Sequence, residues 1–289
     1  MYPYLKLARP QQWVKNFFVL LPSFFAGRAL DYEIYPELLL AFISFSMVSS
    51  AVYILNDYKD IEHDRAHPVK RFRPLADGSA NRKVSLALMI LLVAAGVGVS
   101  FTLARGFQLM LLIYMVVNIG YTFGLKNISI LDLFLVSMGF LIRVYAGGFA
   151  VSITVSHWLA LMIMLLALFL TLAKRRDDLI NTGEDGTIMR KSSRKYNMVF
   201  VNSCLVLFAG VIIVCYIMYT VSAEVVERFN SEWLYATVVF VIAGLMRYLQ
   251  ITFVEEKTGN PSQILVTDGF IITCIVGWIM MFYVIIYTS

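Results

Sequence analysis

Long apolar stretches separated by short polar segments dominate the chain. An apolar helix of roughly 20 residues crosses about 30 Å of hydrocarbon. Nine stretches come close to that length, at about 13–29, 36–56, 84–104, 106–123, 129–150, 156–174, 197–221, 232–253 and 267–287. They are too long and too continuously apolar for the strands of a membrane barrel. The pattern therefore predicts an all-α, polytopic membrane protein with about nine transmembrane helices in one transmembrane domain, residues 1–289.

Composition agrees with this pattern, because 60% of the residues are hydrophobic and only 15% are charged, which is unsuited to a surface in water. The start of the chain has basic residues before an apolar stretch, as a signal peptide does. Since eight further apolar stretches follow, we interpret it as the first transmembrane helix. The three cysteines lie in apolar stretches without metal-site spacing, so neither a disulfide framework nor a zinc site is expected.

The connections alternate between charged loops, at about 57–83, 124–128, 175–196 and 254–266, and short loops with little charge. Of the 24 lysines and arginines, 19 lie in the N-terminal segment and the charged loops, 3 in the opposite loops and the remaining two within helices. The positive-inside rule then predicts a cytoplasmic N-terminus, cytoplasmic catalytic loops and an outside C-terminus. We expect a multi-pass protein of the cell inner membrane, with membrane lipids and no nucleic acid as partners.

An acidic cluster follows the second apolar stretch. Asn56, Asp60 and Asp64 are spaced at i, i+4 and i+8, and Asp57 joins them on one face of a helix. Like charges this close repel, unless a cation lies among them. Oxygen ligands suit Mg²⁺, which commonly bridges carboxylates and substrate phosphates. We predict that Asn56, Asp57, Asp60 and Asp64 hold Mg²⁺; the alternative is a solvated, charged helix end.

The acidic cluster is followed by a basic segment, residues 67–74, HPVKRFRP. Lys70 and Arg73 are suited to neutralise phosphate oxygens, the arginine through its planar fork and the lysine as a point charge. The two segments together predict a site with metal on one side and phosphate on the other.

Residues 56–64, NDYKDIEHD, resemble the first Asp-rich motif, NDxxDxxxD, of the UbiA superfamily of intramembrane prenyltransferases. The predicted helix count is similar to that superfamily as well. The resemblance implies a UbiA-like helical bundle in which Mg²⁺ binds the diphosphate of a donor. It also implies that Asp57, Asp60 and Asp64 are catalytic.

The second motif departs from typical aromatic prenyltransferases of the superfamily. Residues 172–179, LAKRRDDL, carry Lys174, Arg175 and Arg176 where acidic residues are expected. An acidic wall and a basic wall suit a more highly phosphorylated donor, or two phosphorylated substrates. The alternative is that these three cations only set the orientation of the helix in the membrane, as a topology signal.

The N-terminal residues 9–16, RPQQWVKN, are similar to the RPxQWxKN signature of the decaprenyl-phosphate phosphoribosyltransferase branch. Taken alone, this segment is also consistent with an interfacial anchor. The other similarities to that branch are Tyr121 to Lys126, Arg143 with Ala146–Gly148, the pair Lys174–Arg175 with Asp178, and Gly259–Pro261 with Asp268.

The resemblance implies transfer of a 5-phosphoribosyl group from phosphoribosyl pyrophosphate to a polyprenyl phosphate, with Mg²⁺ as cofactor and release of pyrophosphate. The acceptor phosphate is already an anion, so no strong base is needed. The predicted substrate-binding residues are Lys15, Asn56, Lys70, Arg73, Tyr121, Lys126, Arg143, Lys174, Arg175 and Asp178. The alternatives are an aromatic prenyltransferase of quinone biosynthesis and a non-catalytic transporter or lipid-binding protein. A homo-oligomer is possible.

Two arginines, Arg143 and Arg247, lie well inside apolar stretches. Arg143 lies about 14 residues into the fifth stretch, where a charge is costly and marks a structural or functional site. Its alternative is to reach the outer interface beside Tyr145. Arg247 lies nearer the end of the eighth stretch, and we expect its side chain to extend to the membrane surface. The alternative is that it joins the site.

Overall fold

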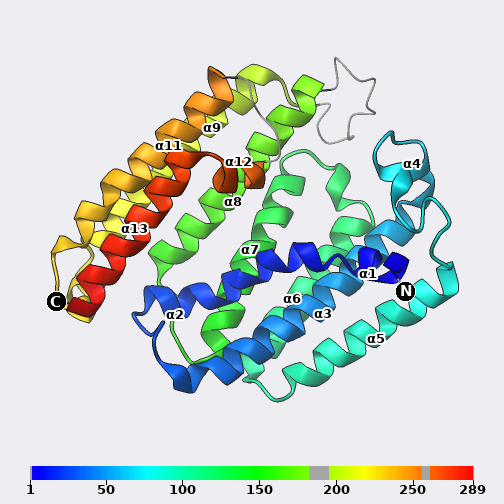
Figure 1. The fold of residues 1–289 in the computed structure, drawn as a ribbon, viewed down its shortest axis with the longest axis horizontal. Helices are drawn as coiled ribbons and strands as arrows, with labels where there is room; N and C mark the ends of the chain where they lie inside the picture. The colour runs from blue at the N-terminus through cyan, green and yellow to red at the C-terminus, as the bar shows by residue number, and fades with distance from the viewer. Residues whose placement is uncertain (1, 182–194, 256–260, 289) are drawn as a thin grey trace. The chain divides into compact units, whose positions relative to one another are not determined.

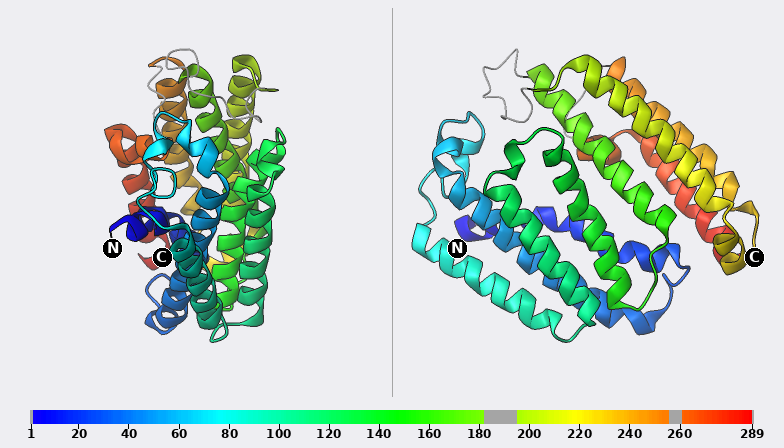
Figure 2. Two further views of the ribbon diagram at one scale, coloured as in Figure 1. Left: turned by 90° about the vertical axis from the view of Figure 1, so that its right-hand side faces the viewer. Right: turned by 180° about the vertical axis from the view of Figure 1, so that it is seen from behind.

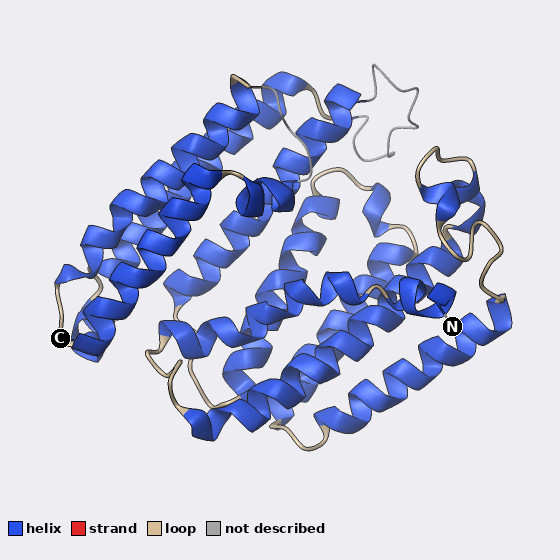
Figure 3. Ribbon diagram, viewed as in Figure 1, coloured by secondary structure: helices blue, strands red, loops and turns tan. Residues whose placement is uncertain are grey.

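The computed structural model describes residues 2–181, 195–255 and 261–288, and every regular element in those ranges is a helix (Figures 1 and 3). The chain forms two compact units, Met1–Val155 and Ser156–Ser289, each a helical bundle. The predicted loops 175–196 and 254–266 extend partly outside the described residues, at 182–194 and 256–260. The prediction of a single transmembrane domain with cytoplasmic loops stays a prediction.

The first unit is built around one long central helix, α3. Its elements, with η marking 3-10 helices, are α1 (Tyr2–Ala8), η1 (Pro10–Leu20), α2 (Leu21–Phe25), η2 (Tyr32–Ile34), α3 (Tyr35–Lys59), α4 (Ile61–Arg65), η3 (Lys70–Phe72), α5 (Arg82–Ser100), α6 (Arg105–Thr122), η4 (Leu125–Asn127) and α7 (Leu131–Ala150). Helix α3 packs against α5, α6, α7 and η1, and Figure 2 shows these long helices side by side. The ring of Phe45 on α3 contacts Phe107 and Tyr114 on α6 edge-on, with centroids 5.6 and 5.4 Å away. The core of this unit therefore lies between α3, α6 and α7.

The described residues of the second unit form four long helices. Its elements are α8 (His157–Asn181), α9 (Met198–Thr220), α10 (Ala223–Phe229), η6 (Trp233–Thr237), α11 (Val238–Phe253), α12 (Pro261–Thr267) and α13 (Gly269–Thr288). Helix α8 packs on α9, and α11 packs on both α9 and α13. A hydrogen bond between the hydroxyls of Tyr216 and Thr237 and one from the Trp278 indole to Tyr216, both 2.6 Å, join α9, η6 and α13.

Seven helical segments in the described residues are long and apolar enough to cross a membrane. They run over Tyr32–Lys59, Arg82–Ser100, Leu131–Ala150, His157–Ile180, Met198–Thr220, Trp233–Phe253 and Gly269–Tyr287. This confirms an all-helical, polytopic architecture but does not confirm the count of about nine. The predicted stretch 106–123 forms α6, which carries the polar residues Arg105, Gln108 and Asn118. The predicted stretch 13–29 is divided between η1 and α2.

The 3-10 helix η1 packs along α3. With three residues per turn, positions i and i+3 lie directly above one another, so Trp13 and Asn16 face the same helix. The indole of Trp13 donates to Ser50 at 2.9 Å, and the amide of Asn16 donates to Ser46 at 3.0 Å. These side-chain bonds fix one face of η1 along α3, while Val14 and Phe17 on the other face are exposed.

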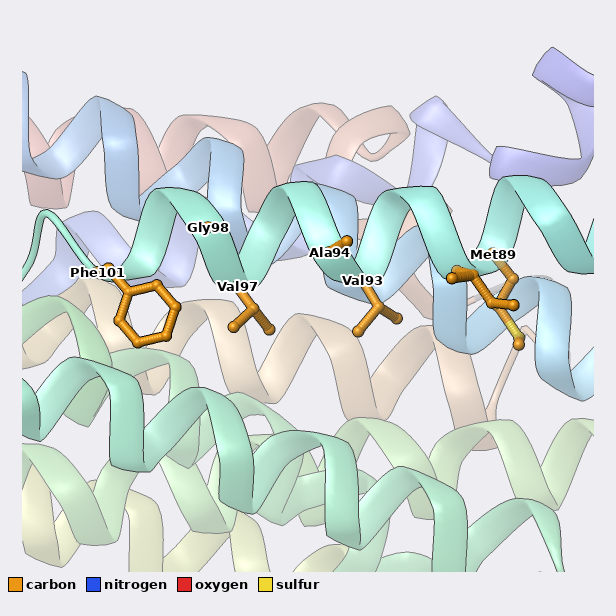
Figure 4. Close-up of a pocket in the computed structure, with 7 residues that line it drawn as sticks. Met89, Val93, Ala94, Val97, Gly98 and Phe101 are labelled. Atoms are coloured by element: carbon orange, nitrogen blue, oxygen red, sulfur yellow. The ribbon is translucent and has the colours of Figure 1, made fainter.

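Helix α5 has a different environment, because it is apolar but buries only Ser85, Gly96 and Ser100. A mostly exposed apolar helix is expected where a protein faces lipid. A shallow hollow of about 480 Å³ on this helix is drawn in Figure 4 and is lined by Met89, Ile90, Val93, Ala94, Val97, Gly98 and Phe101. Since these seven residues carry no charge, the hollow is unsuited to phosphate chemistry.

The close approach of α7 to η1 depends on a glycine. A Cβ atom at Gly147 would lie 1.9 Å from the backbone oxygen of Val19, so Gly147→Ala should force the two elements apart. We expect a loss of about 1–3 kcal/mol in stability, as at other overpacked core sites. Thermal unfolding in detergent measures it. The matched control is Gly98→Ala, because nothing lies within 4 Å of a Cβ there; equal unfolding temperatures for the two variants would contradict the packing described.

Candidate active site

The acidic cluster lies where α3 gives way to α4. Asp57 is in the last turns of α3, Asp60 is at the break and Asp64 is in α4. The amide of Asp64 donates to the carbonyl oxygen of Asp60 at 2.8 Å, so helical hydrogen bonding continues across the break. Asp57 and Asp64 are 2% and 3% exposed. Buried carboxylates at the negative end of a helix are unfavourable unless cations accompany them.

Each of the three carboxylates contacts a cation of the chain itself. Nη1 of Arg73 lies 3.1 Å from Asp57 and 2.7 Å from Asp64, so these two carboxylates converge on one nitrogen atom. Nζ of Lys126, from η4, lies 2.7 and 2.6 Å from the two oxygens of Asp60. The loop after α4 and the connection after α6 are thereby brought to the end of α3.

Asn56 is held as well, because its side-chain oxygen accepts a hydrogen bond of 2.7 Å from the Thr122 hydroxyl. Tyr121 precedes Thr122 at the end of α6 and is half-buried. Lys70 is half-buried in η3, where its amide donates to Nδ1 of His67. The structure thus brings Lys126 and Arg73 to the acidic cluster. It places Tyr121 next to Thr122, which binds Asn56.

A divalent cation requires a rearrangement of these contacts. In the described part of the chain, no group of three His, Cys, Asp or Glu side chains is arranged to hold a metal ion. Asp57 and Asp64 nevertheless converge on the positively charged Arg73, and their oxygens together with Asn56 are the donors that Mg²⁺ prefers. The residues therefore fit a divalent cation that takes the place of the Arg73 guanidinium.

Arg9 also lies in this cluster, although the sequence did not single it out beyond its motif. Its Nη2 lies 2.5 Å from Asp57 and its guanidinium lies over the ring of Tyr53, 5.2 Å from the centroid. Its backbone is left-handed, with φ 51° and ψ 58°, which costs a non-glycine residue on the order of 1–3 kcal/mol. The ion pair and the ring contact offset this cost. No spacing signal in the sequence connects residue 9 with residue 57.

Arg143 is buried in the first unit rather than extended to the outer interface, so the alternative of reaching the membrane surface is wrong. It is 4% exposed. Its guanidinium donates to the Asn16 side chain at 2.8 Å, the Gly139 carbonyl at 2.6 Å and the Tyr114 hydroxyl at 3.0 Å. The neighbouring Lys15 is close enough to Arg143 and Arg9 for the charges to repel. These contacts form a buried, positively charged region along η1.

The basic second motif belongs to the second unit. Lys174 is exposed, whereas Arg175 and Arg176 are 2% and 4% exposed. Nη1 of Arg175 contacts Asp178 at 2.9 Å, and Nε of Arg176 donates to Asn202 at 3.0 Å. Burial of both arginines does not support the reading of this motif as a topology signal only.

Arg247 ties the loop before α13 to α11, instead of only extending to the membrane surface as expected. It contacts Glu255 at 2.6 Å and Asp268 at 2.9 Å. The Arg247 guanidinium, together with the amide of Ile271, holds the pKa of the Asp268 carboxyl below its usual value. Asp268 therefore stays ionised and fixes the start of α13. Gly259 and Asn260, which share its predicted motif, lie outside the described residues.

The chain is similar to known proteins in sequence and in fold. A model of the UbiA prenyltransferase family matches residues 17–183. The decaprenyl-phosphate phosphoribosyltransferase of Mycolicibacterium smegmatis is 31% identical over 95% of this chain and 89% of its own length. The enzyme of the same name from Corynebacterium glutamicum is 29% identical, covering 98% of this chain and 86% of its own length.

The fold is also that of a solved structure. A UbiA homolog from Archaeoglobus fulgidus, bound to GPP and Mg²⁺, matches with a TM-score of 0.73 and covers 98% of this chain and 99% of its own. At 17% identity this likeness shows the fold alone, and it confirms the predicted UbiA-like bundle. The family match over more than half of the chain and the near full-length relatives lead to one conclusion: this chain is an integral membrane protein that belongs to the UbiA prenyltransferase family.

Proposed function

We propose that the chain is a membrane pentosyltransferase that moves a 5-phosphoribosyl group from phosphoribosyl pyrophosphate to a polyprenyl phosphate and releases pyrophosphate. The geometry of Asp57, Asp64 and Arg73 supports the binding of a metal-bound diphosphate. The identity of the donor rests on one observation, the near full-length similarity to relatives named decaprenyl-phosphate phosphoribosyltransferase. The cations of the second motif are consistent with that donor.

The reaction breaks the bond between C1 of the ribose and the pyrophosphate oxygen, and a phosphate oxygen of the acceptor bonds to C1. Negative charge develops on the leaving pyrophosphate, so electrostatic stabilisation is the largest expected catalytic contribution. Mg²⁺, when bound, would supply two positive charges for this purpose. Asn56, Asp57, Asp60 and Asp64 would hold it, and Lys70 and Arg73 would contact the donor phosphates.

The acceptor needs orientation rather than deprotonation, because its phosphate is already anionic at neutral pH. Lys15 and Lys126 are proposed contacts for the 5-phosphate or the acceptor phosphate. Arg143 helps to position Lys15, because it donates a hydrogen bond to Asn16, the next residue. Tyr121, Lys174, Arg175 and Asp178 stay proposed substrate-binding residues on the strength of the sequence resemblance.

The proposed location is the inner membrane, with the N-terminus and the acidic cluster on the cytoplasmic side. The distribution of lysine and arginine supports this orientation. A water-soluble donor would then enter from the cytoplasm, while the acceptor would come from the bilayer. A homo-oligomer stays a prediction.

Release of pyrophosphate tests the proposal. Purified protein in detergent should release pyrophosphate from phosphoribosyl pyrophosphate only when a polyprenyl phosphate and Mg²⁺ are both present. Removal of divalent cations with EDTA should abolish release, and excess Mg²⁺ should restore it. Prenyl transfer from a prenyl diphosphate to 4-hydroxybenzoate, without phosphoribosyl transfer, would identify an aromatic prenyltransferase instead. If phosphoribosyl pyrophosphate binds in the absence of Mg²⁺ and is not turned over, the protein is a transporter or a lipid-binding protein instead.

A further inference from the structure

The acidic cluster is neutralised by the chain itself. Three carboxylates, Asp57, Asp60 and Asp64, face three cations that come from separate segments. Arg9 precedes η1, Arg73 follows η3 and Lys126 lies in η4. A metal ion that binds these carboxylates must therefore displace cations that already occupy them.

Displaced cations need a new anion, since an unpaired charge in a partly buried site is unfavourable. A metal-bound diphosphate brings this anion with it. The metal can bind the carboxylate while the diphosphate oxygens bind the guanidinium, so that each charged group still has a partner of opposite charge. Guanidinium groups suit this exchange because their planar fork matches phosphate oxygens as well as carboxylates.

We propose that Arg9 is a diphosphate-binding residue that holds Asp57 until the metal-bound diphosphate arrives. The inference rests on the proposed function only in requiring a metal-bound diphosphate at the acidic cluster. Arg9 is placed for both roles, because its side chain is 21% exposed and contacts Asp57 at 2.5 Å. The ring of Tyr53 lies beneath its guanidinium, and this contact keeps the charge near the cluster when the partner changes.

The surroundings of Arg9 favour an incoming anion. Lys15 lies close enough to Arg9 for their charges to repel. A diphosphate between them would turn this repulsion into attraction. Arg9 is also fixed at the start of η1 by the left-handed backbone before Pro10, so its side chain is presented from a defined position.

The exchange predicts two effects of opposite sign for Arg9→Gln. Without the competing guanidinium, binding of Mn²⁺ alone to the carboxylates should strengthen. Binding of pyrophosphate in saturating Mg²⁺ should weaken by about tenfold or more, as expected for the loss of a hydrogen bond between charged groups. A residue with only a structural role would change both affinities in the same direction, or neither.

The experiment uses the purified full-length chain in detergent. Electron paramagnetic resonance of free Mn²⁺ measures the binding of metal alone, and isothermal titration calorimetry measures the binding of pyrophosphate in saturating Mg²⁺. Arg28→Gln is the matched control, because Arg28 pairs with Asp31 at the opposite end of α3 from Asp57. It should behave as the wild-type protein in both measurements.

A second variant covers the case in which Arg9→Gln does not fold. Arg9→Lys keeps the charge but loses the fork, so Mn²⁺ affinity should stay near the wild-type value while pyrophosphate affinity falls severalfold. Changes of the same sign in Arg9→Gln, or an unchanged pyrophosphate affinity in either variant, would overturn the proposal. Because pyrophosphate is common to phosphoribosyl and prenyl donors, this outcome is independent of which donor the enzyme uses.

Discussion

Replacing Asp57 with Asn should reduce phosphoribosyl transfer by at least about a hundredfold, the scale expected when a group that stabilises transition-state charge is lost. The substitution keeps the size of the side chain but removes its charge. Asp57 is the carboxylate that both Arg9 and Arg73 contact, so its loss affects the proposed metal and the cations together. Steady-state release of pyrophosphate measures the effect.

Asp31→Asn is the matched control for this variant. Asp31 pairs with Arg28 before the start of α3, far along the helix from Asp57, and its replacement should leave the rate near the wild-type value. Activity of Asp57→Asn within a few-fold of the wild type, with Mg²⁺ still required, would remove Asp57 from the proposed metal site.

Replacing Arg143 with Met should destabilise the first unit by about 2–4 kcal/mol, because buried partners are left without hydrogen bonds. The side-chain oxygen of Asn16 and the hydroxyl of Tyr114 would both lose their donor. Methionine keeps the unbranched stem of the side chain and removes its guanidinium end, so the lost polar contacts dominate the effect. Thermal unfolding in detergent measures it.

Arg228→Met is the control for loss of an arginine, since Arg228 forms a partly exposed pair with Glu224 within one helix. Exposed pairs of this type contribute about 0–1 kcal/mol. If Arg143→Met unfolds at the same temperature as Arg228→Met, the buried network does not hold η1, α6 and α7 together.

Helical architecture and the acidic cluster were predictable from the sequence, because each depends on local patterns. Apolar stretches of membrane length predict helices whatever their neighbours are. The spacing of Asp57, Asp60 and Asp64 gives a shared helix face, and their charges indicate cations nearby. The shared face persists across the break at Asp60, because the amide of Asp64 still donates to the carbonyl oxygen of Asp60.

Features that depend on long-range contacts were not predictable. The position of η1 along α3 depends on bonds of Trp13 and Asn16 to serines on α3, which no local propensity reveals. Arg9 lies 48 positions before Asp57, and only the fold brings them together. For Arg143 the sequence likewise left two predictions open, a buried site or the membrane surface. The position of a charge along a helix does not show which other elements cover it.

The mass of the lipid product tests the central claim most directly. Purified protein would be incubated with Mg²⁺, a polyprenyl phosphate, 4-hydroxybenzoate and equal amounts of phosphoribosyl pyrophosphate and a prenyl diphosphate, and the extracted products analysed by mass spectrometry. We expect a polyprenyl phosphate that has gained one phosphoribosyl group, with its amount reduced by at least about a hundredfold when Asp57→Asn replaces the wild-type protein. A prenylated 4-hydroxybenzoate, with the polyprenyl phosphate unchanged, would contradict the proposed function.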